Sequence, residues 1–178
     1  MKMQERFVKK FMKKFYNRYE YYANSCERQL NELKLIKVEN SSLKRQLKTI
    51  NSVLNRGDEI LEVVDTKYIV FKESGTDIVV ADTLNPYNHN YKTKILCSWD
   101  TTAKTIHIDD IYSNSYSEGF GTIAMNALFK NAKVLGIEII TGAMSPVDTN
   151  DREHKERLIK FYTKNGFEIN YPHIKKIL

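Results

Sequence analysis

Two glycines in the middle of the chain could bring backbone amides to an anionic ligand. Gly119 and Gly121 flank Phe120, and Thr122 continues into a segment with helical periodicity. A residue without a side chain lets a ligand approach the backbone N–H groups, and the start of a helix carries the positive end of its dipole. The spacing indicates a turn that binds pyrophosphate, and the alternative is a plain tight turn before a helix.

Carboxylates stand shortly before this turn, where the alternation of a predicted strand is interrupted. Ile106 and Ile108 point to one face, but the next apolar residue is Ile111, so the alternation shifts by one residue across Asp109-Asp110. A β-bulge produces such a shift. A carboxylate or an imidazole beside the bulge could take a proton from a substrate. The candidate bases, which could instead be solvated surface groups, are His107, Asp109 and Asp110.

The positions of these groups depend on an α+β fold that the periodicity predicts. Alternating segments separated by turn residues indicate an antiparallel meander, with strands at 68–72, 77–83, 92–99 and 105–112. Helical and extended segments then follow one another, at 121–135 (helix), 137–141 (strand), 151–165 (helix), 167–170 and 173–178 (strands). The order predicts a mixed, mostly antiparallel central sheet with flanking helices.

The first third of the chain has the pattern of a coiled-coil helix. Residues 1–56 contain neither Gly nor Pro, so no residue type forces the backbone to break. Twelve of the fourteen a and d positions of one heptad register are apolar or aromatic. These fourteen positions are Val8, Met12, Phe15, Tyr19, Tyr22, Cys26, Gln29, Leu33, Ile36, Asn40, Leu43, Leu47, Ile50 and Leu54. We expect a helical stalk over 1–56, followed by a second domain at 58–178.

Charged residues beside this seam favour two parallel chains. Glu32 and Glu39 fall at g positions. Lys37 and Lys44 lie five residues further along, at e positions, which is the spacing of ion pairs between parallel helices. Asn40 occupies an a position, where a single Asn can fix register and strand number. The pattern predicts a parallel homodimer through residues 8–54.

Two polar stretches leave a second arrangement of this region open. Asn24-Ser25 and Asn40-Ser41-Ser42 consist of residue types that cap helices. The chain could turn back at either place, so the alternative prediction is an intramolecular helical hairpin.

Positive charge is concentrated in the first third of the chain. The net charge of the whole chain is +6; residues 1–57 hold 14 Lys and Arg against 5 Asp and Glu, a net of +9, and residues 58–178 hold 14 against 17, a net of −3. Seven of these cations lie within residues 2–18, opposed only by Glu5. This basic arm could bind nucleic acid, an anionic membrane or an acidic partner, and the alternative is a solvated helix face.

Composition favours a soluble protein without disulfides or metals. The 178 residues are 42% hydrophobic and 28% charged, which is enough to bury a core. No stretch approaches the ~18 apolar residues that span a bilayer, and the first residues lack the apolar core of a secretory signal, so we expect a cytoplasmic protein. Cys26 and Cys97 lie 71 positions apart, without metal-ligand spacing. We expect two buried thiols and no metal site.

Two motifs in the second half of the chain resemble those of one enzyme family. Residues 111–125 are similar to a segment in which a bulged strand enters a Gln/Arg-x-x-Gly-x-Gly/Ala loop. Residues 158–167 match a helix that ends in Phe-Tyr-x-x-x-Gly-Phe. Both motifs belong to the GCN5-related N-acetyltransferase (GNAT) family, which transfers the acetyl group of acetyl-CoA to an amine. The resemblance covers about residues 92–178.

The resemblance implies roles for particular residues. Ile111 and Ser113 would offer backbone contacts to the pantetheine arm of acetyl-CoA. The residues that would bind its pyrophosphate are Gly119, Phe120, Gly121 and Thr122. Tyr162 would lie near the thioester sulfur and protonate the departing thiolate, and Asp109 or Asp110 would serve as the base. The acceptor would be an amine of a small molecule or a protein.

Departures from the family pattern keep two other functions open. Tyr116 stands where the family has Gln or Arg, and Glu118 adds a negative charge to the loop. The two helices that cover the acceptor in the family are not visible between residues 58 and 92, although the stalk or the loop 85–91 could replace them. The alternatives to an acetyltransferase are a non-catalytic scaffold that dimerises through its coiled coil and a nucleic-acid-associated factor that uses residues 2–18.

Overall fold

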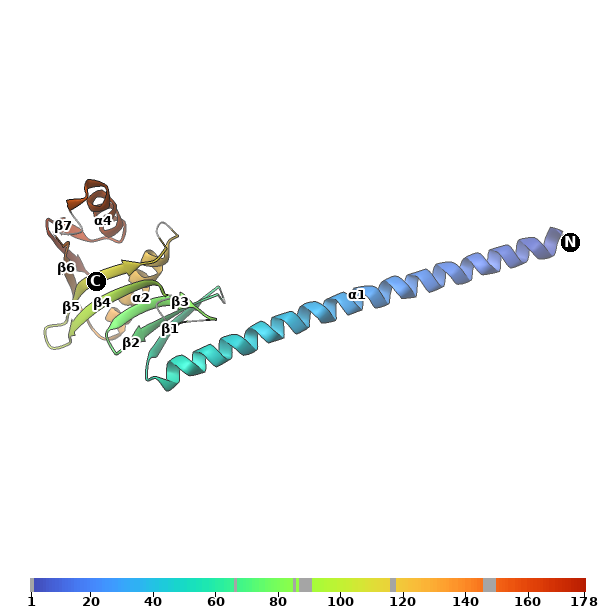
Figure 1. Cartoon of the computed structure of the whole chain (residues 1–178), viewed down its shortest axis with the longest axis horizontal. Coiled ribbons are helices and arrows are strands. Elements are labelled where there is room, and N and C mark those ends of the chain that lie inside the picture. Colours follow the sequence, from blue (N-terminus) through green and yellow to red (C-terminus); the bar gives the residue numbers. More distant parts are fainter. Residues whose placement is uncertain (1, 66, 85, 87–90, 116–117, 146–149) are drawn as a thin grey trace. The chain divides into compact units, whose positions relative to one another are not determined.

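A computed structural model describes residues 2–178 with the exception of 66, 85, 87–90, 116–117 and 146–149, and it leaves out the side chains of 2–5 and 7 (Figure 1). Tyr116 and most of the loop 85–91 therefore lie outside the described residues. The elements are α1 (Lys2–Asn55), β1 (Glu59–Val64), β2 (Tyr68–Glu73), β3 (Asp77–Asp82), β4 (Tyr91–Asp100), β5 (Thr105–Ser113), α2 (Phe120–Val134), β6 (Ile139–Ala143), α4 (Arg152–Lys164), β7 (Glu168–Asn170) and β8 (His173–Ile177).

The strands form one sheet in the order β1-β2-β3-β4-β5-β6-β8-β7. Strands β1 to β5 form an antiparallel meander, and β5 and β6 are parallel, connected by α2. Strand β8 pairs antiparallel with both β6 and β7. The predicted α+β class with a mixed, mostly antiparallel sheet is confirmed.

Strand β1 is an element that the sequence patterns do not predict. Its pairing with β2 shifts register between Ile60 and Glu62, so Leu61 interrupts the alternation on which the prediction depends. Strands β2 and β3 are joined by a turn at 74–76, without the two acceptor-covering helices. The expectation that these helices are missing between 58 and 92 is therefore confirmed for the described residues.

The chain divides into two compact units, Met1–Arg45 and Gln46–Leu178. The helical-hairpin alternative is wrong, because α1 continues through Asn24 and Asn40. Ser41 lies in the middle of this helix, and its Oγ donates to the carbonyl oxygen of Lys37 at 2.8 Å. A hydroxyl bonded in this way stays within a helix instead of starting a new one.

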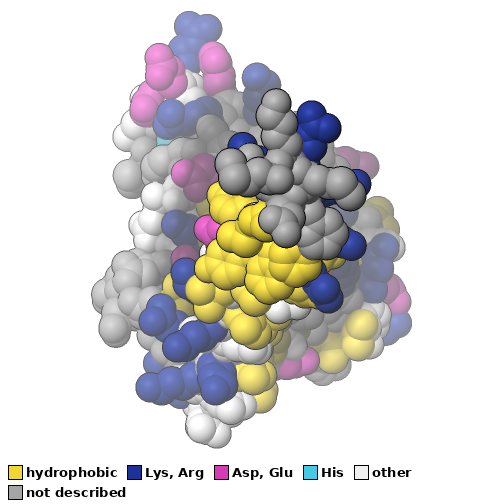
Figure 2. All heavy atoms as spheres, turned by 90° about the vertical axis from the view of Figure 1, so that its right-hand side faces the viewer, with side chains coloured by type: hydrophobic (Ala, Val, Ile, Leu, Met, Phe, Trp, Pro, Cys, Tyr) yellow, Lys and Arg dark blue, Asp and Glu magenta, His cyan; other side chains and the backbone are white. Residues whose placement is uncertain are grey.

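Two clusters of buried side chains lie on opposite faces of the sheet. Val70 and Val80 belong to the cluster beneath α2 and α4. Phe71 and Val79, their neighbours along β2 and β3, belong to a second cluster with Val53 of α1. Successive strand residues point to opposite faces, so the last turns of α1 and the helices α2 and α4 cover different sides. Figure 2 shows that hydrophobic side chains also gather in one area of the surface, beside Lys and Arg side chains.

The two thiols lie in different environments. Cys97 is buried, and this burial, together with the charges of Asp77 and Asp109, raises the pKa of its thiol. Cys26 is exposed, so the prediction that both thiols are buried is wrong for Cys26. The reason is that the Met1–Arg45 unit contains a single helix and no second element to cover it.

Two absences hold for the described part of the chain. None of its helices combines the length and the apolar character that crossing a membrane requires. No group of three or more His, Cys, Asp and Glu side chains in it is placed to hold a metal ion.

Candidate active site

The parallel strands β5 and β6 separate near the predicted bulge. Their pairing runs from Thr105 opposite Ile139 to Ile108 opposite Gly142. Beyond Ile108, β5 continues to Ser113 with β4 as its partner, whereas β6 ends at Ala143. Ligands of sheets with parallel strands commonly bind beyond the carboxyl ends of those strands. The end of β5 is therefore a place for an extended ligand.

The predicted bulge is present in β5. Leu96 lies opposite Asp110 and Cys97 opposite Ile108, so Asp109 has no partner residue on β4. The Asp109 side chain is exposed, and its Oδ2 accepts a hydrogen bond from Oγ of Ser98 at 2.7 Å. The bulge thus holds a solvent-facing carboxylate in a defined position.

The other two candidate bases are held differently. Oδ1 of Asp110 accepts a hydrogen bond from the N–H of Ile111 at 2.7 Å, so this carboxylate is bound to its own strand. His107 is exposed, and its Nδ1 lies 3.0 Å from Oγ1 of Thr141 on β6. Of the three groups, Asp109 is the carboxylate that faces solvent without a backbone hydrogen bond in the described residues.

Helix α2 starts at the predicted glycine turn. Gly119 is its N-cap residue and adopts the left-handed conformation with φ of 86°, which glycine reaches without steric cost. The carbonyl oxygen of Gly119 accepts from the N–H groups of Thr122 and Ile123. The N–H groups of Phe120 and Gly121 make no hydrogen bond to any residue that the structure describes. These amides are the donors that a helix start offers to an anion.

Lys92 adds a positive charge at this helix start, and no sequence motif indicated it. Its Nζ lies 5.8 Å from the ring centroid of Phe120, and this buried ring also packs edge-on against Tyr68 at 4.8 Å. The carbonyl oxygen of Lys92 accepts from the N–H of Asn114 and from Oγ of Ser113. One residue of β4 therefore both anchors the end of β5 and brings an ammonium near α2. The sequence pattern could not reveal the position of the Lys92 side chain, because Lys92 lies at a register shift between β3 and β4 that only the tertiary structure shows.

Helix α4 approaches the same turn through the second motif. A Cβ on Gly121 would lie 2.9 Å from Cε2 of Phe161, so the absence of a side chain at Gly121 makes room for this ring. Tyr162 is 6% exposed, and its ring centroid lies 5.4 Å from those of Phe161 and Phe167. The C-cap residue Asn165 donates from Nδ2 to the carbonyl oxygen of Phe161 at 2.8 Å. The Phe-Tyr pair is thus fixed beside the start of α2.

The structure brings most of the predicted site residues to one end of β5. The glycine turn and the Phe-Tyr motif meet through Gly121, and Ser113 lies at the strand end that precedes the turn. The N–H of Ile111 already donates to Oδ1 of Asp110. Glu118 is exposed at the entrance to the turn.

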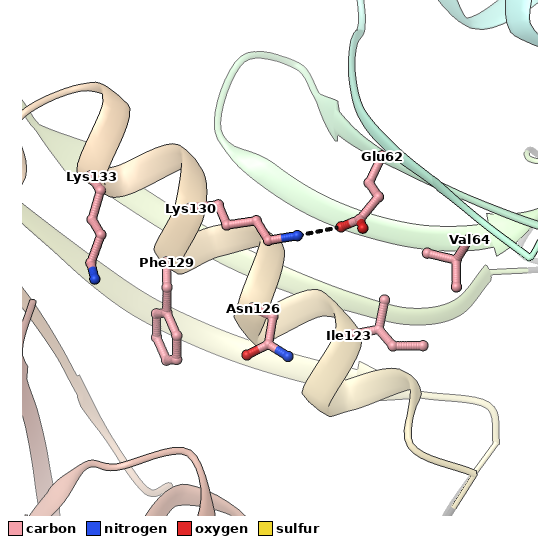
Figure 3. A pocket seen from close by; sticks show the side chains of 7 residues that line it. All are labelled: Glu62, Val64, Ile123, Asn126, Phe129, Lys130 and Lys133. Atoms are coloured by element: carbon pink, nitrogen blue, oxygen red, sulfur yellow. Dashed lines mark hydrogen bonds and ion pairs between the residues drawn. The ribbon is translucent and has the colours of Figure 1, made fainter.

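A separate hollow of about 340 Å³ lies between α2 and β1 (Figure 3). Its lining residues are Glu62, Val64, Ile123, Asn126, Phe129, Lys130 and Lys133. An ion pair of 3.1 Å joins Lys130 Nζ to Glu62 Oε2 across it. The hollow contains none of the predicted site residues.

Comparisons with known proteins find similarity in structure and none in sequence. No protein-family model matches the chain, and no curated protein matches it. GCN5 of Tetrahymena matches with a TM-score of 0.44 and 13% identity over 57% of this chain and 66% of that one. Nourseothricin acetyltransferase matches with a TM-score of 0.43 and 12% identity over 64% of this chain and 66% of that one. The chain thus spans slightly less than two thirds of either structure.

A third similar structure is yncA of Salmonella typhimurium, solved with acetyl-CoA. It matches with a TM-score of 0.41 and 12% identity over 62% of this chain and 65% of that one. Others among the similar structures are described as acetyltransferases of the GNAT family. At these identities and TM-scores the similarity by itself assigns no function to this chain.

Proposed function

We propose that this chain is an acetyl-CoA-dependent N-acetyltransferase whose catalytic part lies in residues 58–178. The start of α2 carries the proposal: the amides of Phe120 and Gly121 have no partner among the described residues, and Lys92 lies close by. A diphosphate supplies the negative charge and the acceptor oxygens that such a helix start binds. Acetyl-CoA would place its diphosphate at Gly119–Thr122 and its pantetheine arm along the end of β5.

The proposed reaction needs an uncharged amine, because an ammonium has no lone pair with which to attack a thioester. Asp109 takes the proton of the amine, directly or through one water. The nitrogen then forms a bond to the carbonyl carbon while the carbon–sulfur bond breaks, and the new amide nitrogen loses its second proton to solvent. Tyr162 donates its hydroxyl proton to the departing thiolate and regains a proton from solvent. The acceptor class is an amine of a small molecule or a protein.

The helical region contributes partners to the proposal. We propose that residues 8–54 form a homodimer. Nucleic acid is a further candidate partner, which would bind the basic arm at residues 2–18. Binding of nucleic acid to that arm would weaken steeply with salt, because each neutralised phosphate releases counterions. A slope near zero in a plot of the logarithm of the binding constant against the logarithm of the salt concentration would exclude nucleic acid as a partner.

Calorimetric titration of acetyl-CoA into the full chain tests the proposed activity. We expect binding in the micromolar range, and pantetheine, which has no diphosphate, should bind far more weakly because it cannot reach the amides of α2. Equal affinities for the two compounds would refute the role of the helix start. The absence of any heat with acetyl-CoA would favour the non-catalytic scaffold.

A further inference from the structure

The apolar seam of α1, defined by the a and d positions from Val8 to Leu54, is exposed in the single chain at all its large apolar residues except Ile50. Large seam residues of the Met1–Arg45 unit are all exposed, namely Val8, Met12, Phe15, Tyr19, Tyr22, Leu33, Ile36 and Leu43. Their burial against a partner would release about 1.5–3 kcal/mol for each large apolar side chain. A row of this kind indicates a protein interface.

Where α1 packs on the sheet, the seam is partly covered: its d position Ile50 packs against the buried cluster of the sheet, whereas its two a positions remain exposed. Within the Gln46–Leu178 unit, Thr49 and Val53 are buried, and Val53 contacts the cluster of Ile69 and Phe71. Leu47 and Leu54, which are both a positions, are 58% and 53% exposed. The domain thus covers one face of the helix and leaves these two leucines available.

We infer that the occupant of the seam is a second copy of this chain, bound parallel and in register. Charge complementarity favours this arrangement, because a parallel pair places Glu32 near Lys37 and Glu39 near Lys44 of the second copy. An antiparallel pair would not bring these g and e positions together. The in-register dimer also places Asn40 opposite Asn40, where the two amides can hydrogen-bond to each other. This inference does not depend on the proposed acetyl transfer.

The in-register pairing also brings two cysteines together. Cys26, an exposed a position, lies opposite Cys26 of the second copy. Opposed a residues of a parallel pair are close enough for the two sulfur atoms to bond. Cys97 cannot form this link, because it is buried in the domain. A disulfide between the two Cys26 residues would therefore report that the two helices are parallel and in register.

Sedimentation equilibrium of the full chain tests whether the dimer exists. We expect twice the mass of one chain. Leu33→Asp should raise the dimer dissociation constant by about a hundredfold or more, because it places a carboxylate in the seam. Leu35→Asp is the matched control: Leu35 is 70% exposed and Leu33 63%, but Leu35 lies outside the seam. A monomeric wild type, or equal effects of the two substitutions, would overturn the inference.

Oxidation with diamide tests orientation and register. Each disulfide forms from two thiols, and diamide takes up the two protons and two electrons to become the hydrazine. We expect a covalent dimer within minutes, reversible by dithiothreitol and absent in Cys26→Ser. A dimeric protein that forms no such link would show that the chains are antiparallel or out of register, and it would overturn the arrangement proposed here.

Discussion

The ring of Phe161 lies in the space that a side chain on Gly121 would occupy, with Cε2 at 2.9 Å and Cζ at 3.3 Å from the position of a Cβ. The two glycines of the turn therefore have different roles. Gly119 supplies a backbone conformation with φ of 86°, and a Cβ there would meet nothing within 4 Å. Gly121 supplies room, which allows α4 to approach α2.

Replacement of Gly121 by Ala should lower the free energy of unfolding by about 1–3 kcal/mol, because the ring of Phe161 must move. It should also weaken acetyl-CoA binding, since the displaced helices carry the site. Urea unfolding and calorimetry would measure the two effects. Phe161→Leu in the same chain should restore part of the loss, and strictly additive effects of the two substitutions would contradict the contact.

The ammonium of Lys92 should contribute to coenzyme binding. Lys92→Met removes a charge near Phe120 while it keeps a side chain of similar length, and we expect the dissociation constant for acetyl-CoA to rise about tenfold. The dependence of affinity on salt concentration should become weaker. Lys133→Met is the control, because Lys133 is exposed near the opposite end of α2. Equal effects of the two variants would show that Lys92 has no specific role.

Asp109 should be the base of the proposed reaction. Asp109→Asn should lower kcat by about 10²–10⁴-fold with a small change in the dissociation constant for acetyl-CoA. Asp110→Asn is the comparison: the amide oxygen can still accept from the N–H of Ile111, so the strand keeps its hydrogen bond. Ser98→Ala should give an intermediate loss, because it releases the Asp109 carboxylate. A larger loss in Asp110→Asn would reverse the assignment.

The hydroxyl of Tyr162 should matter for turnover more than for binding. Tyr162→Phe keeps the ring between Phe161 and Phe167 and removes the proposed proton donor. We expect kcat to fall by about ten- to a hundredfold while calorimetry gives an unchanged affinity for acetyl-CoA. An unchanged kcat would assign Tyr162 to packing alone.

Lys94 should stabilise the fold at neutral pH. Its Nζ lies 2.7 Å from Glu73 Oε2 and 3.1 Å from Asp77 Oδ2. Burial alone would lower the pKa of Lys94, but the hydrogen bonds and charges of the two carboxylates outweigh it and raise the pKa. Lys94→Met should therefore lower the free energy of unfolding by about 2 kcal/mol.

The sign of the pKa shift fixes the pH range of this effect. Because the folded pKa of Lys94 is raised, its contribution is fully present below the unfolded pKa of about 10.4 and is lost as pH rises through the folded value. The difference between wild type and Lys94→Met should stay constant between about pH 7 and about pH 9 and shrink above about pH 10.4. Lys104→Met, which breaks an exposed pair with Glu138, should change stability by less than about 1 kcal/mol. Urea unfolding across this range measures both variants.

The local pattern of apolar and polar residues was sufficient to predict most helices and strands and the bulge in β5. The missing alternation between Ile108 and Ile111 predicted a bulge across Asp109-Asp110, because the side-chain period of a strand is two and an inserted residue must change it. The structure identifies Asp109 as the unpaired residue. Asp151, a good N-cap residue, and Gly166, with φ of 77°, bracket the helix that the pattern placed at 151–165. The sequence pattern did not predict strand β1, because the register shift within this strand removes the alternation of apolar and polar residues.

What the sequence determined by itself is therefore short in range: the period of each segment, the heptad seam and the two glycines, all set by residues within a few positions of one another. The tertiary structure alone decided that Lys92 lies near Phe120, that Phe161 fills the space above Gly121, and that Val53 rather than Leu54 faces the sheet. Each of these contacts depends on strand register or on how a helix packs. Side-chain volume and burial across the whole domain set such choices, and no local spacing encodes them.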